Sequence, residues 1–110
     1  GLPKIQEILE TLRKNPPAEI AGYKVLKARD YMADTVKDME TGEVTPTGLP
    51  SSNVLYYDMP DGTWLCVRPS GTEPKVKFYY GVKGISLEDA DAKSAAMGKE
   101  VLAMIDAMLA

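Results

Sequence analysis

The sequence contains no histidine, and this absence removes several classes of chemistry. Ser-His and Cys-His catalytic arrangements and histidine-based metal sites all require an imidazole. The single cysteine, Cys66, leaves no partner for an intrachain disulfide and too few ligands for a zinc site. A glycine-rich dinucleotide fingerprint and a Walker loop are missing as well. These absences favour a binding domain, or one part of a larger enzyme.

Long hydrophobic runs and an excess of positive charge are also missing. No apolar stretch approaches the roughly 20 residues that a membrane helix requires, and we expect no signal peptide because no charged and then apolar segment is present. The 13 Lys and Arg are outnumbered by 16 Asp and Glu, which gives a net charge of −3. Domains that grip nucleic acid through its phosphates are usually basic. We therefore expect no membrane or nucleic-acid partner, and a cytoplasmic location because nothing indicates an oxidising compartment.

The remaining composition is that of one globular domain over residues 1–110. Of the 110 residues, 45% are hydrophobic and 26% are charged. Apolar residues recur at spacings of three and four in a first predicted helix: Leu2, Ile5, Ile8, Leu9 and Leu12. The chain starts directly on this helix, and we interpret that start as the sign of a domain cut from a longer protein.

Four strands are predicted after this helix, over residues 20–30, 53–59, 63–68 and 75–83. Asp61-Gly62 joins the second strand to the third, and this dipeptide is the strongest short-range signal for a hairpin. Turn-forming residues dominate segment 31–53, which is predicted as a loop with the option of a short hairpin around Thr41-Gly42.

A second helix is predicted after Ser86, a good N-cap residue that is followed by acidic residues in the first turn. Its apolar stripe consists of Met97, Val101, Met104, Ile105, Met108 and Leu109. Gly98 is expected to weaken this helix somewhat. The order α-β-β-β-β-α predicts an α+β fold, in which two helices pack on one face of a four-stranded antiparallel sheet.

The segment Arg68-Pro69-Ser70-Gly71-Thr72-Glu73-Pro74, between the third and fourth strands, has the features of an anion site. Arg68 offers a planar fork that matches phosphate oxygens two at a time. Ser70 and Thr72 supply hydroxyl donors. Gly71 lets the backbone approach a ligand closely, and successive N–H groups in such a turn can converge on an anion. The segment therefore suits a phosphate monoester.

The same segment is also compatible with an ordinary turn, because Ser, Gly, Thr and Pro are common turn residues. Arg68 could then pair with Asp58 or Glu73. The carboxylate of Glu73 would repel a phosphate, whereas Lys75 and Lys77 on the next strand would attract one. The residues alone leave both interpretations open.

Other side chains near this segment have simpler interpretations. Trp64 shares the strand alternation of Arg68 and could line the same face. Cys66 is predicted to be a buried or half-buried filler. Tyr56, Tyr57, Tyr79 and Tyr80 are predicted to pack across strands.

The string at 68–74, with Lys75-Val-Lys-Phe-Tyr79 after it, resembles the phosphate-binding loop of the α-D-phosphohexomutase superfamily, which includes phosphoglucomutases and phosphomannomutases. The flanking strands, the last helix and segments 52–55 and 61–64 agree with this resemblance, which extends over the whole chain. It implies the TBP-like C-terminal domain, the last of four. In the family, that loop holds the phosphate that is not being transferred, while the hexose phosphate reorients between half-reactions at its 1- and 6-positions.

By position, the resemblance implies that Arg68, Ser70, Gly71 and Thr72 contact this phosphate, with Lys77 as a weaker candidate. It also implies glucose or mannose phosphates as substrates, the other three domains as partners, and magnesium as a cofactor of the full-length enzyme. The family's catalytic serine loop, Asp-rich magnesium loop and sugar-recognition loop lie in those other domains. We therefore expect no catalytic residue, metal ligand or cofactor in this chain.

Two alternatives belong to other functional classes. The chain could be a stand-alone regulatory module that uses the same loop for another phosphometabolite or a carboxylate. It could also be a docking domain in which the loop is only a turn.

Overall fold

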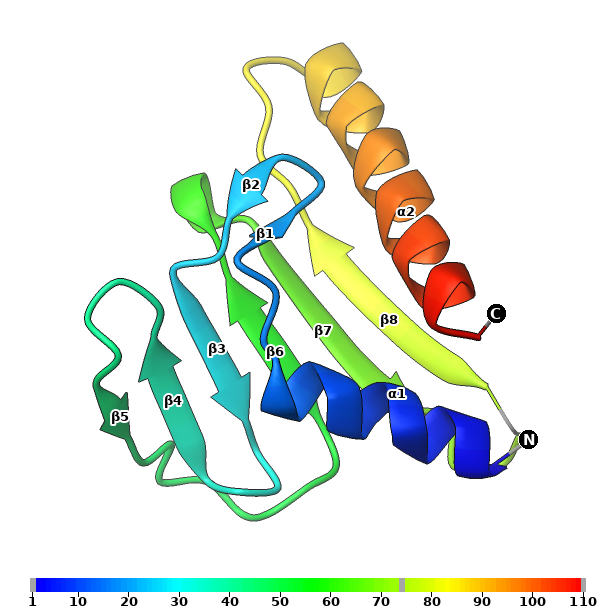
Figure 1. Ribbon diagram of the computed structural model, residues 1–110. Coiled ribbons are helices and arrows are strands. Elements are labelled where there is room, and N and C mark those ends of the chain that lie inside the picture. Colours follow the sequence, from blue (N-terminus) through cyan, green and yellow to red (C-terminus); the bar gives the residue numbers. More distant parts are fainter. Residues whose placement is uncertain (1, 74, 110) are drawn as a thin grey trace.

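The computed structural model describes residues 2–73 and 75–109, without the side chains of Leu2, Pro3 and Leu109. Within these residues it contains two helices, eight strands and a short 3₁₀ turn (Figure 1). The elements in chain order are α1 (Leu2–Lys14), β1 (Glu19–Ile20), β2 (Tyr23–Lys24), β3 (Lys27–Asp30), β4 (Thr35–Asp38), β5 (Val44–Thr45), β6 (Leu55–Asp58), η1 (Pro60–Gly62), β7 (Trp64–Pro69), β8 (Val76–Gly81) and α2 (Leu87–Leu109).

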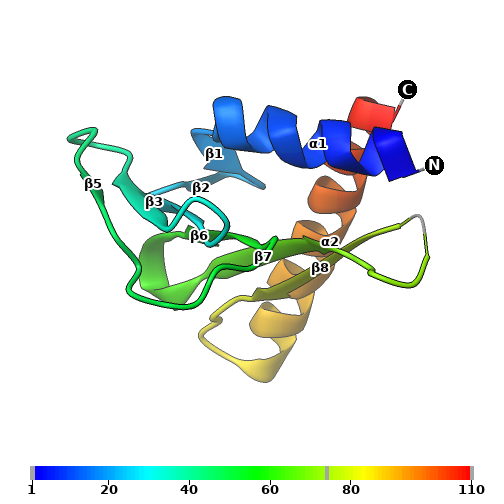
Figure 2. The ribbon, with the colours of Figure 1, turned by 90° about the horizontal axis from the view of Figure 1, so that it is seen from below.

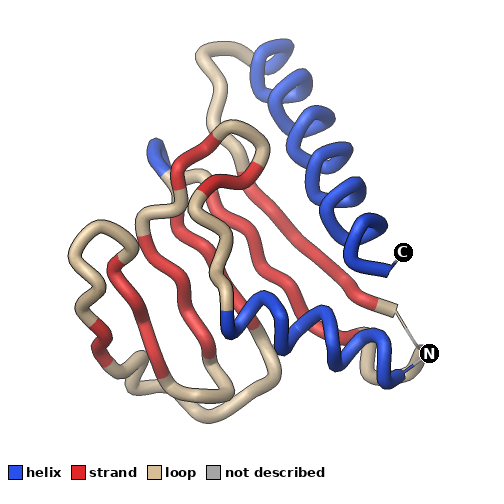
Figure 3. The backbone as a smooth tube through the Cα atoms, viewed as in Figure 1, coloured by secondary structure: helices blue, strands red, loops and turns tan. Residues whose placement is uncertain are grey.

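The strands form an antiparallel sheet of six, in the order β5-β4-β3-β6-β7-β8, and a separate β1–β2 hairpin (Figure 3). The predicted α+β class is confirmed, but the predicted number of four strands is wrong. Residues 31–53 add β4 and β5 outside β3. The option of a hairpin at Thr41-Gly42 is confirmed, because β4 pairs antiparallel with β5. The carboxylate of Asp38 accepts the N–H groups of Glu40 and Thr41 in the turn between them.

The single strand predicted over residues 20–30 is also wrong, because a tight turn separates β1 from β2, and residues 25–26 separate β2 from β3. Ala21 and Gly22 have φ values of 52° and 82°. Both lie in the left-handed region, as the central residues of a type I′ hairpin turn do. The hairpin then folds back, and Ile20 is buried in the core.

The hairpin predicted at Asp61-Gly62 is confirmed. These two residues have φ values of 59° and 70°, and the N–H of Thr63 donates to the carbonyl of Pro60 at 3.2 Å. The turn sets the register of β6 against β7, in which Tyr57 lies opposite Leu65. Since residues paired directly across antiparallel strands share a face, this register places a continuous apolar row on one side of the sheet.

The core lies between that apolar face and the two helices. α1 crosses the face, while α2 runs beside β8 (Figures 1 and 2). The predicted helical stripes are buried at Ile5, Ile8, Leu9, Leu12, Met97, Val101 and Ile105, and they meet Leu55, Tyr57, Leu65 and Val67 of the sheet. Full burial of one such side chain stabilises the folded state by about 1.5–3 kcal/mol. The predicted contributions of Leu2 and Leu109 lie outside the described side chains.

The start of α2 is capped as predicted. The N–H of Asp89 donates to the hydroxyl of Ser86 at 3.1 Å, which satisfies one of the free N–H groups of the first turn. Over its described residues, neither helix has the length and apolar character needed to span a bilayer.

Candidate functional site

The face of the sheet turned away from the helices is called the open face here. The strand registers and the alternation of side chains place Arg29, Tyr56, Asp58, Trp64, Cys66, Arg68, Lys77 and Tyr79 on it. Trp64 therefore shares a face with Arg68, as predicted. The loop that joins β7 to β8 leaves the sheet at the Arg68 end of this face.

Arg68 lies near the end of β7, directly opposite Lys77 of β8. Its guanidinium donates from Nη2 to the hydroxyl of Tyr79 at 3.1 Å, and its Cζ lies 5.5 Å from the centre of that ring. The predicted pairings with Asp58 and Glu73 are wrong. Each of these carboxylates has another cation as its partner, so the two positive charges of Arg68 and Lys77 stand side by side.

Asp58 and Glu73 each form an ion pair with a cation other than Arg68. The Oδ2 of Asp58 lies 2.7 Å from the Nε of Arg29, and the Oε2 of Glu73 lies 3.0 Å from the Nζ of Lys75. Lys75 thus balances the negative charge of Glu73, which by itself would repel a phosphate. Arg68 forms no ion pair with any carboxylate in the described part of the chain.

The loop is closed by a hydrogen bond from the N–H of Ser70 to the carbonyl of Lys75 at 2.9 Å. Gly71 has a φ of 86°, a conformation that favours glycine. The hydroxyl oxygens of Ser70 and Thr72 lie 3.4 Å apart. Pro74, the last residue of the string at 68–74, lies outside the described residues.

The backbone of this loop also has donors to offer. The N–H groups of Gly71, Thr72 and Glu73 donate to no other residue that the structure describes. Free N–H groups on successive residues of a turn are what an anion-binding nest uses. The structure therefore brings Ser70, Gly71 and Thr72 together on one turn, with Arg68 and Lys77 at its base.

Tyr79 is the residue of this site that the sequence analysis missed, because it was assigned only to cross-strand packing. Its hydroxyl accepts from Arg68, and its ring lies against the guanidinium. Its position two residues after Lys77 in β8 could have identified it, because residues two apart on a strand share a face. These two contacts suit Tyr79 to a positioning role for the guanidinium.

Farther along the open face, β3, β6 and β7 carry an ion pair and two stacked aromatic rings. Arg29 pairs with Asp58, and its Cζ lies 5.1 Å from the centre of the Tyr56 ring. Tyr56 in turn stacks on Trp64, with ring centres 5.7 Å apart. The hydrogen bond to Asp58 raises the pKa of Arg29, so this cation stays charged and paired. Lys27 of β3 lies on the same face and also forms no ion pair among the described residues, so unpaired positive charge lies there as well as at the Arg68 end.

The described residues of this face support neither a reactive thiol nor a metal site. Burial raises the pKa of the Cys66 thiol, and the residue is half-buried, as predicted for a filler. A thiol of raised pKa is a poor nucleophile. Among the described residues, no three His, Cys, Asp or Glu side chains lie close enough together to hold a metal ion. These residues do not fit the magnesium that the resemblance implies for the full-length enzyme.

Comparison with known proteins gives the family. The model of the family described as "Phosphoglucomutase/phosphomannomutase, C-terminal domain" matches residues 8–95. The chain belongs to this family. A phosphoglucomutase of Staphylococcus aureus strain MSSA476 is 37% identical over 97 residues, which cover 88% of this chain and 17% of the relative. A phosphoglucomutase of Staphylococcus saprophyticus is 35% identical over 89 residues, which cover 81% of this chain and 16% of the relative.

This phosphoglucomutase/phosphomannomutase domain thus spans less than a fifth of the length of either relative. No solved structure matches it. The resemblance inferred from the string at 68–79 is confirmed for the family and for the C-terminal domain. The roles that it implies for single residues remain predictions.

Proposed function

We propose that this domain is the phosphate-binding wall of a phosphoglucomutase or phosphomannomutase. It holds the phosphate of the hexose phosphate that is not being transferred, while a phosphoryl group passes between the 1- and 6-positions at groups of the other domains. One observation carries this proposal. Arg68 and Lys77 lie opposite each other at the base of the turn that contains Gly71, and Arg68 forms no ion pair with a carboxylate among the described residues.

Charge and hydrogen bonding support a phosphate monoester as the ligand. At neutral pH its phosphate carries between one and two negative charges, about what Arg68 and Lys77 together balance. The guanidinium offers two parallel donors, and the hydroxyls of Ser70 and Thr72 and the free N–H groups of the turn supply more. A charge-assisted hydrogen bond of this kind contributes about 1.5–3 kcal/mol.

The relatives favour this function over its alternatives. Both are phosphoglucomutases in which the matched part is a small share of the chain, which supports a domain of a larger mutase over a stand-alone regulatory module. Catalysis, magnesium binding and the choice between glucose and mannose are then tasks of the other domains. The cytoplasmic location also remains a prediction.

The proposal predicts binding of glucose 6-phosphate by the chain itself. Amide NMR shifts recorded during a titration should saturate at a Kd on the order of 1 mM, which corresponds to about 4 kcal/mol. The shifts should centre on Ser70–Glu73 and on the Arg68 side chain. Inorganic phosphate should produce the same pattern and glucose none. A response to glucose would show that the shifts do not report the phosphate. No response to either phosphate at tens of millimolar would mean that the loop requires the other domains or is only a turn.

Tyr79 is predicted to act as a positioning residue for Arg68. Tyr79→Phe keeps the ring beside the guanidinium but removes a hydrogen bond whose net contribution is about 0.5–1.5 kcal/mol, so phosphate affinity should fall by about two- to tenfold. Tyr79→Leu also removes the cation–π contact and should lower the affinity further.

The matched control for this titration is Tyr31→Phe, which removes a hydroxyl that accepts a 3.4 Å hydrogen bond from Arg29. It should leave phosphate affinity unchanged. Equal affinities for the wild type and both Tyr79 variants would show that Arg68 needs no positioning by Tyr79.

A further inference from the structure

Glu73 places a negative charge on the loop that is proposed to bind a phosphate. Its Oε2 lies 3.0 Å from the Nζ of Lys75, and the N–H of Lys75 donates to the carbonyl of Glu73 at 2.8 Å. The backbone contact keeps the two residues beside each other, so the ion pair forms without ordering a longer stretch of chain. The pair thus occupies the ammonium group of Lys75.

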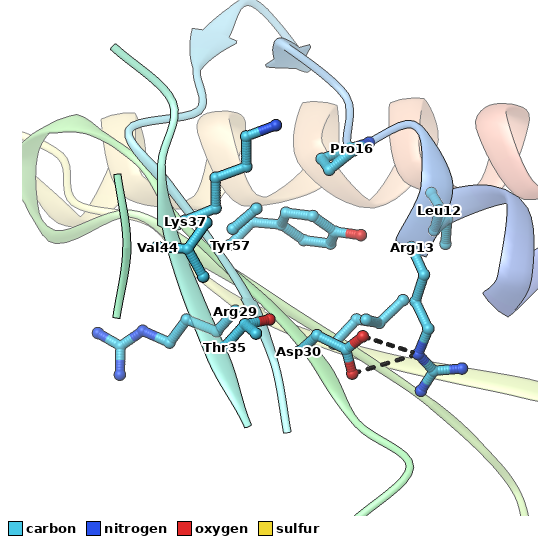
Figure 4. Close-up of a pocket in the computed structure, with 11 residues that line it drawn as sticks. Leu12, Arg13, Pro16, Arg29, Asp30, Thr35, Lys37, Val44 and Tyr57 are labelled. Carbon is cyan, nitrogen blue, oxygen red and sulfur yellow. Dashed lines mark hydrogen bonds and ion pairs between the residues drawn. The ribbon is translucent and has the colours of Figure 1, made fainter. Parts of the chain in front are cut away.

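This ion pair is too exposed to contribute much to folding. The side chain of Lys75 is 69% exposed and that of Glu73 is 56% exposed, and pairs between exposed side chains add little to stability. The pair between Arg13 and Asp30 differs in this respect, because both of its side chains are less than a fifth exposed and it links α1 to the sheet (Figure 4). Stability therefore gives no reason for a carboxylate in the loop.

Lys75 lies where a third cation of the phosphate site would lie. The N–H of Ser70 donates to the carbonyl of Lys75 at 2.9 Å, which continues the β7–β8 pairing one step beyond the last register pair. Because side chains alternate along a strand, Lys75 falls on the face of Lys77, and Ser70 falls on the face of Arg68. An ammonium group that Glu73 did not engage would stand beside a phosphate held by Ser70 and Arg68.

The charge of the site suggests why this third cation is engaged. Arg68 and Lys77 supply two positive charges, which match those of a phosphate monoester, and the Glu73–Lys75 pair adds no net charge. A third free cation would strengthen binding. Transfer between the 1- and 6-positions requires each end of the hexose phosphate to occupy the loop in turn, so the phosphate has to leave the loop during the proposed reaction.

We infer that Glu73 is a release residue. It holds the ammonium group of Lys75 away from the bound phosphate and so keeps the affinity of the loop low enough for the hexose phosphate to leave. The inference rests on the proposed function, since it concerns the same loop and the same phosphate.

Glu73→Gln tests this role, because it keeps the size of the side chain and removes the charge that engages Lys75. The Kd of glucose 6-phosphate, measured by amide NMR at low ionic strength, should fall by about three- to tenfold. The matched control is Glu40→Gln, which breaks the similarly exposed pair of Lys24 and Glu40 at 2.9 Å. Glu40 follows β4 at the end of the sheet where β7 begins, whereas the loop lies where β7 ends, so this control should leave the Kd unchanged.

Lys75→Gln distinguishes the freed cation from the simple loss of a negative charge. It should weaken phosphate binding more in the Glu73→Gln background than in the wild type, because only in that background does the ammonium group contact the phosphate. The side-chain Cε signal of Lys75 should accordingly shift with glucose 6-phosphate in Glu73→Gln and stay unchanged in the wild type.

Three results would overturn the inference. Equal effects of Lys75→Gln in the two backgrounds would show that Glu73 acts only through its own charge. An unchanged or weaker affinity of Glu73→Gln would show that Glu73 restrains no cation, and it would leave the proposed function intact as long as the wild type binds phosphate. Absence of phosphate binding in both the wild type and Glu73→Gln would overturn the inference together with the proposed function.

Discussion

Arg68→Ala is expected to remove detectable binding of glucose 6-phosphate by this domain. The guanidinium is the one group of the site that can bind two phosphate oxygens at once, and each charge-assisted hydrogen bond contributes about 1.5–3 kcal/mol. Loss of even one of these two bonds should weaken binding by roughly 10- to 100-fold. Starting from an affinity on the order of 1 mM, such a loss leaves no saturable shift at Ser70–Glu73.

Two control variants separate geometry from charge. Arg68→Lys keeps the charge but loses the planar fork and the contact with Tyr79, so it should retain only part of the binding. Arg29→Ala removes a cation from the same open face, but one that is already paired with Asp58. It should leave phosphate affinity nearly unchanged. If Arg29→Ala weakens binding as much as Arg68→Ala does, the attraction is a general effect of surface charge and Arg68 has no special role.

The predictions that held depend on strong local signals. Asp61-Gly62 suits left-handed φ values, and such a turn joins adjacent antiparallel strands. β8 alternates apolar and polar side chains, so its two faces were readable without any knowledge of its neighbours. Together these signals fixed β6, β7 and β8, and with them the position of the loop that carries Arg68.

The predictions that failed concern segments whose structure depends on side-chain hydrogen bonds or on unusual backbone angles. Ala21 adopts a left-handed φ of 52°, which its residue type does not suggest. The outer strands β4 and β5 form in a segment rich in turn residues, because Asp38 accepts the N–H groups of the turn between them. Composition alone favours a loop there.

The site was predictable in its parts but not in its pairings. The residues of the loop were identified by their chemistry and by the family resemblance. The partners of Asp58 and Glu73, and the role of Tyr79, depend on register and on side-chain direction.

At Gly98, we expect packing against Tyr80 to outweigh helix propensity. On propensity alone, Gly98→Ala should stabilise α2 by about 1 kcal/mol. In the structure, a Cβ at this position would lie 2.5 Å from the hydroxyl oxygen and 3.3 Å from Cζ of Tyr80 in β8. We therefore expect Gly98→Ala to lower the free energy of unfolding by about 1–3 kcal/mol, as overpacking does.

A double-mutant cycle with Tyr80→Phe tests this explanation. Tyr80→Phe removes the atom that the new methyl group would meet first, so most of the cost of Gly98→Ala should disappear in that background. Urea unfolding of the four proteins gives the coupling energy, and Lys99→Ala, at an exposed position of α2, should have little effect. If Gly98→Ala stabilises the wild type as much as it stabilises Tyr80→Phe, then α2 can move away from β8 at little cost. Glycine at this position would then serve no packing purpose.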